Sequence, residues 1–215
     1  MSVADRPRTS ESGRFSELAA RVTVAPGAGR EDLEIENPAV GRMLGVVPRC
    51  TAEDVELAVR RAREAQASWA DTGFAEREAL LMRLHDLVLD RQDEVLDVIQ
   101  LESGKARRHA FEEILDVALV SRYYARSAGR LLRPQRRRGA LPFLTATWEQ
   151  HHPVGVVGVI SPWNYPLTLS LSDAVPAIAA GNAVVMKVDS KTPFSGLIGL
   201  SLLLEAGLPP DVLQV

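Results

Sequence analysis

Residues 153–166 read Pro-Val-Gly-Val-Val-Gly-Val-Ile-Ser-Pro-Trp-Asn-Tyr-Pro. The run from Val154 to Ile160 has the length and continuous apolar character of a strand that is buried on both faces. Its glycines lie inside this run, so the glycine-rich phosphate loop that usually follows such a strand is missing. The stretch predicts a buried parallel strand that ends in a loop of unusual composition.

The residues after this loop alternate between helical and strand patterns. An apolar helix is expected at 167–180, a second strand at 183–188, another helix at 194–206 and a third strand at 211–215. Strands and helices that alternate with short links are typical of a parallel, doubly wound sheet. We therefore predict an α/β fold with a Rossmann-like parallel sheet, whose ligands bind outside the carboxyl ends of its strands.

The residues before the sheet are mostly helical in pattern. Thr51, with Asp54 three residues on, predicts a capped helix start, and Gly104 and Gly129 are the expected ends of two later helices. Two short strands are expected at 33–38 and 45–48, and they could pair as a hairpin. Helices are expected at about 51–69, at about 75–103 with a break near 90–92, and at about 107–128.

The composition indicates a globular protein. Hydrophobic residues make up 46% and charged residues 25% of the chain, and the net charge of −3 gives no general attraction to nucleic acid or to an anionic membrane. The single cysteine, Cys50, excludes an internal disulfide bond and fits a reducing compartment. The first residues resemble no secretion signal and no apolar run reaches membrane-spanning length, so we expect a cytoplasmic protein.

A basic segment precedes the sheet. Between Val117 and Trp148 there is no acidic residue, and seven arginines lie in that span. It could bind nucleic acid or form a solvated or subunit-facing surface. We favour the second interpretation because no helix-turn-helix, zinc or aromatic stacking pattern accompanies the arginines. Residues 144–152 alternate like an exposed strand.

Two loops could carry chemistry. In the first, Trp163 offers an apolar surface, and the amide of Asn164 could stabilise an oxyanion. A turn asparagine beside a packed tryptophan explains the same residues, and the loop by itself favours that interpretation. In the second, Lys187 ends a strand and is followed by Asp189 and Ser190. It could hold a phosphate or a sugar hydroxyl, or be a solvated strand-end lysine.

The stretch 153–166 closely resembles the strand-loop signature of the aldehyde dehydrogenase superfamily. The resemblance continues in order and spacing and covers about 33–215. The further matching residues are Trp69, Leu101-Glu-Ser-Gly-Lys105, Tyr123-Tyr-Ala125, Ala179-Ala-Gly-Asn-Ala-Val-Val-Met-Lys187, Thr192-Pro193 and Ala206-Gly-Leu-Pro209. The sequence of the loop and helix that follow Asn164 most resembles a bacterial branch of the family described as succinate-semialdehyde dehydrogenase (NADP+)-like.

The resemblance implies roles for both loops. Asn164 would be the oxyanion-stabilising amide. The cofactor-binding residues would be Ser161, Pro162, Trp163, Asn164, Lys187, Val188, Asp189 and Ser190, and no metal site is implied. The polar composition and missing periodicity of residues 1–30 predict a flexible leader. For the rest of the chain, the resemblance implies a helical N-terminal part of the cofactor-binding domain at 31–130, an oligomerisation hairpin at 131–152 and an incomplete Rossmann-like core at 153–215. The complete protein would be a homo-oligomer that oxidises a small aldehyde.

The resemblance also implies that this chain lacks the chemical step. Family members attack the aldehyde with a cysteine thiolate, and a glutamate activates water to hydrolyse the thioester. Both residues would lie beyond Val215, and Cys50 is in the wrong place to be the nucleophile. The chain is thus either part of an aldehyde dehydrogenase or a degenerate product that at most binds a nucleotide or a sister subunit. The DNA after the Val215 codon would distinguish these two hypotheses, since a continued reading frame supports the first and a stop codon supports the second.

Three positions differ from residues that are common in the family. Val188 stands where the family commonly has proline. Succinate-semialdehyde dehydrogenases often carry an arginine for the substrate carboxylate at the place of Ser172, yet succinate semialdehyde remains the expected substrate. Members that prefer NAD tend to carry glutamate at the place of Ser190, so we expect NADP, with NAD possible. The negative charge of Asp189 would disfavour the 2′-phosphate of NADP. Its side chain should point away from that of Ser190 if the loop stays extended.

We predict that the 215-residue chain oxidises no aldehyde with either nicotinamide cofactor, because it has no positioned thiol and no general base. Reduced cofactor formed on incubation with aldehydes is followed by absorbance. If the chain oxidises an aldehyde and Cys50→Ser abolishes this activity, then Cys50 is the nucleophile and its exclusion from that role is wrong.

Overall fold

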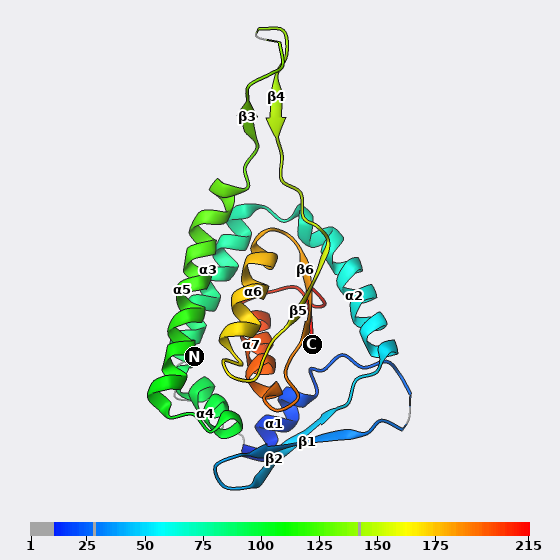
Figure 1. The fold of residues 1–215 in the computed structure, drawn as a ribbon, viewed down its shortest axis with the longest axis vertical. Helices are drawn as coiled ribbons and strands as arrows, with labels where there is room; N and C mark the ends of the chain where they lie inside the picture. The colour runs from blue at the N-terminus through cyan, green and yellow to red at the C-terminus, as the bar shows by residue number, and fades with distance from the viewer. Residues whose placement is uncertain (1–10, 28, 142) are drawn as a thin grey trace.

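The computed structural model describes residues 11–27, 29–141 and 143–215 (Figure 1). The helices in these ranges are α1 (Glu11–Ala19), α2 (Ala52–Asp71), α3 (Phe74–Asp90), α4 (Gln92–Ser103), α5 (Arg107–Leu131), α6 (Thr168–Ala179) and α7 (Pro193–Glu205). The strands are β1 (Asp32–Asn37), β2 (Arg42–Pro48), β3 (Gln135–Arg137), β4 (Thr147–Glu149), β5 (Val156–Ile160), β6 (Ala183–Lys187) and β7 (Leu213–Gln214). The predicted hairpin of β1 and β2 is confirmed as an antiparallel pair.

The parallel sheet has the strand order β5-β6-β7. Its register sets Val156 opposite Ala183 and Ile160 opposite Lys187. Side chains alternate across a strand, so one face turns towards α6 and the other towards α2. Figure 1 shows these two helices on opposite sides of the strands. The predicted α/β fold with a parallel Rossmann-like sheet is confirmed.

The expectation that the first strand is buried on both faces is wrong. Val159 is buried, whereas Ile160 is 81% and Val154 is 82% exposed. β5 is an edge strand, and in the part of the chain that the structure describes, its face towards α2 is covered only in part. Some apolar side chains of this run are therefore exposed to solvent in this chain.

The expected loose leader is also partly wrong. Residues 1–10 lie outside the described residues, but α1 is a helix, and Phe15 and Leu18 on it are buried. The Phe15 ring packs against Phe194 of α7, with 4.6 Å between the ring centroids. After α1 the chain stays attached, since Thr23 N–H donates to Val215 O at 2.7 Å. The polar residues around Phe15 and Leu18 made the sequence of this short amphipathic helix resemble a disordered segment.

Two glycines of the helical region have different roles. Gly104 ends α4 in the left-handed conformation, with φ of 71°, as predicted. Gly129 does not end α5, which runs on to Leu131. A Cβ atom at Gly129 would lie 3.3 Å from Phe74 Cβ. This glycine therefore allows α3 and α5 to approach each other closely.

The predicted hairpin before the sheet is present as β3 and β4. The two strands pair antiparallel and project beyond the ends of the helices in Figure 1. The strand expected at 144–152 is regular only over Thr147–Glu149. Arg137 of the basic segment pairs with Glu149 across the hairpin at 2.6 Å. Among the described residues, no helix is both long and apolar enough to span a membrane.

The start of α2 is capped as predicted. Thr51 N–H donates to Asp54 Oδ2 at 2.7 Å, and Ala25 N–H donates to Asp54 Oδ1 at 2.6 Å. These backbone donors hold the pKa of Asp54 well below its usual range. The carboxylate thus both caps the helix and fixes the segment that follows α1.

Arg77 joins α2, α3 and α6 inside the core. Its guanidinium donates to Trp69 O at 3.1 Å, to Ala70 O at 2.8 Å and to Ala179 O at 3.2 Å. Its Cζ atom lies 5.3 Å from the centre of the Phe74 ring. The planar fork therefore satisfies carbonyl groups at two helix ends, where backbone acceptors have no partner in their own helix.

We predict that Arg77→Lys lowers the free energy of unfolding by about 2 kcal/mol, because lysine cannot reproduce the forked contacts to the Ala70 and Ala179 carbonyls. Urea unfolding followed by circular dichroism measures the change. Arg122→Lys, at an exposed site on α5, is the matched control and should leave the midpoint unchanged. Equal effects of the two substitutions would contradict this role for Arg77.

Candidate functional site

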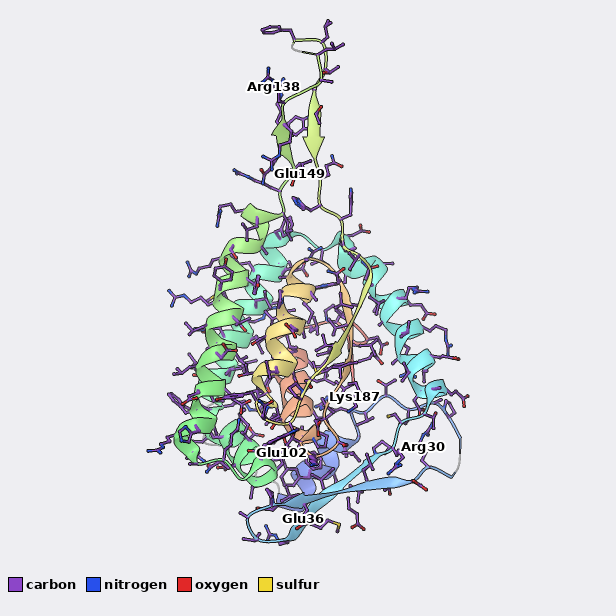
Figure 2. The ribbon with its side chains drawn as sticks, viewed as in Figure 1. Arg30, Glu36, Glu102, Arg138, Glu149 and Lys187 are labelled. Carbon is purple, nitrogen blue, oxygen red and sulfur yellow. The ribbon has the colours of Figure 1, made fainter. Side chains whose placement is uncertain are left out.

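The register of β5 and β6 brings the two predicted loops to one edge of the sheet. Ile160 lies opposite Lys187, and Ser161 N–H donates to Lys187 O at 3.0 Å. The first loop, 161–166, and the second loop, 188–192, therefore start side by side. Figure 2 shows Lys187 far from the hairpin residues Arg138 and Glu149. This edge is where ligands of doubly wound sheets bind.

The second loop is a tight turn. Lys191 N–H donates to Asp189 Oδ1 at 2.9 Å, and Thr192 N–H donates to Asp189 O at 3.2 Å. The extended loop assumed from the sequence is therefore wrong. The Asp189 carboxylate is engaged by its own loop, while the side chains of Lys187 and Ser190 are exposed.

A cavity of about 630 Å³ lies between the partly covered face of the parallel sheet, α2 and β2. Its walls are mainly apolar and include Val55 and Val59 of α2 and Val185 of β6. Four of the predicted site residues line it, namely Lys187, Val188, Asp189 and Ser190. Two further cations from outside the sheet also line it, Arg49 and Arg63. An apolar cavity with a few polar groups at its edge is typical of a small-molecule site.

The first loop contributes differently. Pro162, Trp163 and Asn164 are exposed and are not among the residues that line the cavity. Ser161 is buried and accepts a hydrogen bond from Ser170 Oγ at 2.9 Å. The structure thus places the predicted residues at one sheet edge, but it separates an apolar cavity beside the second loop from an exposed first loop.

Two buried glutamates near the loops were not singled out from the sequence as functional. Glu113 of α5 accepts hydrogen bonds from Leu167 N–H at 2.9 Å and Thr168 N–H at 3.1 Å, at the start of α6. Glu102 of α4 does the same at the start of α7, from Phe194 N–H at 2.8 Å and Ser195 N–H at 2.6 Å. We call Glu102 and Glu113 the capping glutamates.

The capping glutamates change what these helix ends can bind. The first N–H groups of a helix commonly bind phosphate. Here a carboxyl group occupies those donors at the start of both α6 and α7. A phosphate group near this edge would have to meet side chains such as Lys187 and Ser190 instead. This agrees with the missing glycine-rich fingerprint.

Ser172 of α6 donates a hydrogen bond to Asp116 Oδ2 of α5 at 2.6 Å. Ser172 is the position at which the sequence comparison expected an arginine in carboxylate-binding relatives. A serine bound to an acidic side chain offers no positive charge to a substrate carboxylate.

Cys50 does not resemble an activated nucleophile. Partial burial and the nearby charge of Asp54 raise the pKa of its thiol, and Arg30 only partly opposes this. Reactive cysteines have a lowered pKa. The raised pKa of this thiol agrees with the expectation that Cys50 is not the catalytic thiol.

The parallel sheet, with two loops at the carboxyl ends of its strands and an adjoining cavity, defines an α/β protein with a Rossmann-like fold. The model of the aldehyde dehydrogenase family matches residues 24–215. The chain therefore belongs to the aldehyde dehydrogenase family.

Individual relatives agree with this membership. A Mycolicibacterium smegmatis protein, provisionally named succinate-semialdehyde dehydrogenase [NADP(+)], is 50% identical over 94% of this chain and 39% of its own length. An NAD-dependent benzaldehyde dehydrogenase from Corynebacterium glutamicum is 33% identical, with a TM-score of 0.81 over 88% of this chain and 41% of that chain. An NADP-dependent glyceraldehyde-3-phosphate dehydrogenase from Bacillus halodurans, complexed with NADP, is 32% identical, with a TM-score of 0.80 over 86% and 40%. The chain thus spans less than half the length of these relatives.

The buried carboxyl of Glu102 generates a pH prediction. Burial raises its pKa to about 8, although the N–H donors of Ser195 and Phe194 oppose this. Between its ordinary pKa of 4.5 and pH 8, the folded chain then holds a proton that the unfolded chain has released. This contribution to stability is present at low pH and is lost as pH rises towards 8.

We therefore expect the free energy of unfolding to fall, relative to that of Glu102→Gln, by up to roughly 1.4 kcal/mol per pH unit between pH 5.5 and 8, and to level off above. Urea unfolding of both proteins across this range measures the difference. Glu112→Gln, at an exposed site on α5, is the control and should give no such slope. A pH-independent difference for Glu102→Gln would contradict a raised pKa.

Proposed function

We propose that this chain supplies the nucleotide-binding part of an NADP-dependent aldehyde dehydrogenase and binds the cofactor at the carboxyl edge of β5 and β6. The carrying observation is the register that sets Ile160 opposite Lys187 beside an apolar cavity of about 630 Å³. That volume is ample for an adenine ring with its ribose, and cationic side chains stand at its edge.

The residues present fit such a cofactor. Apolar side chains of α2 and β6 suit the flat faces of an adenine ring, while Lys187 and Ser190 suit a ribose and its phosphate. The remaining predicted cofactor contacts, Ser161 to Asn164 and Val188 to Asp189, frame the same edge. When bound, the nicotinamide would accept a hydride from the substrate.

Asn164 is the one catalytic residue that we assign within this chain. Its side chain is exposed on the first loop, so its amide N–H group is free to approach a carbonyl oxygen. A donor aimed at the oxygen that gains negative charge stabilises the transition state of attack on an aldehyde. The thiol nucleophile and the water-activating base would come from residues outside these 215.

Ser190 supports NADP as the cofactor. It is neutral, exposed and lies between Lys187 and Lys191, so a 2′-phosphate would meet positive charge and a hydroxyl donor. The Asp189 carboxylate is engaged by Lys191 N–H. One relative is named for NADP and one solved structure is complexed with NADP, while another is named as NAD-dependent.

Succinate semialdehyde is the substrate that the relatives support best, since the Mycolicibacterium smegmatis protein is named for it. Within this chain, the Ser172–Asp116 pair provides no cation for the substrate carboxylate. If succinate semialdehyde is the substrate, its carboxylate must be held by residues beyond those described. The projecting β3–β4 hairpin is suited to join copies of the protein into a homo-oligomer. We propose a cytoplasmic enzyme with no nucleic-acid or membrane partner.

The cofactor proposal predicts that the chain binds NADP more tightly than NAD and that Ser190→Glu reverses this preference by at least about tenfold. A carboxylate at this position would repel a 2′-phosphate and accept hydrogen bonds from ribose hydroxyls. Calorimetric titration with each nucleotide measures both dissociation constants.

Ser190→Ala is the matched control, because it removes the hydroxyl without adding charge and should weaken NADP binding only by severalfold. Tighter binding of NAD by the parent chain, or an unchanged preference in Ser190→Glu, would contradict the assignment of this loop.

A further inference from the structure

The capping glutamates connect the helical part of the chain to both loops. Glu102 and Glu113 are 2% and 0% exposed, and each accepts two backbone N–H groups at the start of α7 or α6. A buried polar group that loses its partners is costly, so each glutamate restricts where its helix can begin. The sequence resemblance included Glu102 but gave it no role.

Each loop is thereby held at both ends. The first loop starts at the end of β5, where Ser161 N–H is bonded to Lys187 O at 3.0 Å, and it ends at the helix start held by Glu113. The second loop starts at the end of β6 and ends at the helix start held by Glu102. With both ends fixed, such short loops have few accessible conformations.

Lys105 extends this arrangement to a side chain of the first loop. Its Nζ atom pairs with Glu113 Oε1 and lies 4.1 Å from the centre of the Tyr165 ring. Gly104, in the left-handed conformation, forms the turn between Glu102 and Lys105. One turn, 102–105, therefore supplies a cap for the second loop and a contact for the first.

We propose that Glu102 and Glu113 are positioning residues for the nucleotide site: Glu102 sets the second loop, and Glu113, together with Lys105, sets the first. The ligand-binding part of this inference rests on the proposed function. The glutamates do not touch the nucleotide. They act by holding the backbone from which Lys187–Ser190 and Trp163–Asn164 project.

Hydrogen exchange on the ligand-free chain tests the positioning directly. Glu102→Gln keeps one acceptor oxygen but sets an amide donor against a backbone N–H, so amides of 188–195 should exchange roughly fivefold to tenfold faster. Glu113→Gln should do the same at 161–168. Each variant should leave the other loop unchanged. Glu112→Gln, at an exposed site on α5, is the matched control.

Lys105→Met provides a variant that keeps both caps. It should raise exchange in 161–166 severalfold and leave 188–195 unchanged, since only the contact with Tyr165 and the charge partner of Glu113 are lost. This variant still tests the hold on the first loop if Glu113→Gln fails to fold. Exchange that is equal to that of Glu112→Gln at both loops, or that rises equally throughout α3, would overturn the positioning role.

Nucleotide binding supplies a readout that general destabilisation would not move. Glu102→Gln should lower the ratio of the NAD to the NADP dissociation constant at least threefold, because Ser190 lies on the loop that Glu102 holds. Glu113→Gln should leave that ratio unchanged. Equal weakening of both nucleotides by Glu102→Gln would overturn the ligand-binding part. If the parent chain binds neither nucleotide, the proposed function fails, whereas the exchange data still decide the positioning claim.

Discussion

The parallel pairing of β5 with β6 is the constraint on which the site depends. Because Ile160 and Lys187 share a register position, the two loops that follow them start at the same edge. A shift by one residue would turn every side chain of β5 to the other face and separate the loops. The helices fix this pairing from both faces, with α6 on one side and α2 on the other.

Much of this arrangement could be predicted from the sequence. Buried apolar runs of strand length and apolar helices gave the parallel sheet, and residue types at Thr51, Asp54 and Gly104 located helix ends correctly. Predictions failed where packing between distant segments decided the outcome. Gly129 serves the contact with Phe74, and α1 is held by the distant Phe194. Local sequence does not report such contacts.

The loop residues of the candidate site could be predicted from the sequence, but the cavity beside them could not. Besides the sheet itself, the walls of the cavity come from α2 and β2, which precede the sheet by many residues. The capping glutamates did leave a signal: Glu102 continues the apolar helical face of Val95 and Ile99, and Glu113 lies on the face of Ala110 and Val117. An acid on an apolar helical face needs a buried partner, and here the partner is the start of another helix.

The central claim is that a nucleotide binds at the carboxyl edge of β5 and β6 in this chain. The most direct measurement is an NMR titration of the ¹⁵N-labelled chain with NADP, followed through backbone amide shifts. The account predicts that the largest shift changes fall at 161–164 and 187–190 and along the α2 side of the cavity. Changes centred on the arginines of 133–138, with the sheet edge unaffected, would show that phosphate binds the basic hairpin instead and would contradict the account.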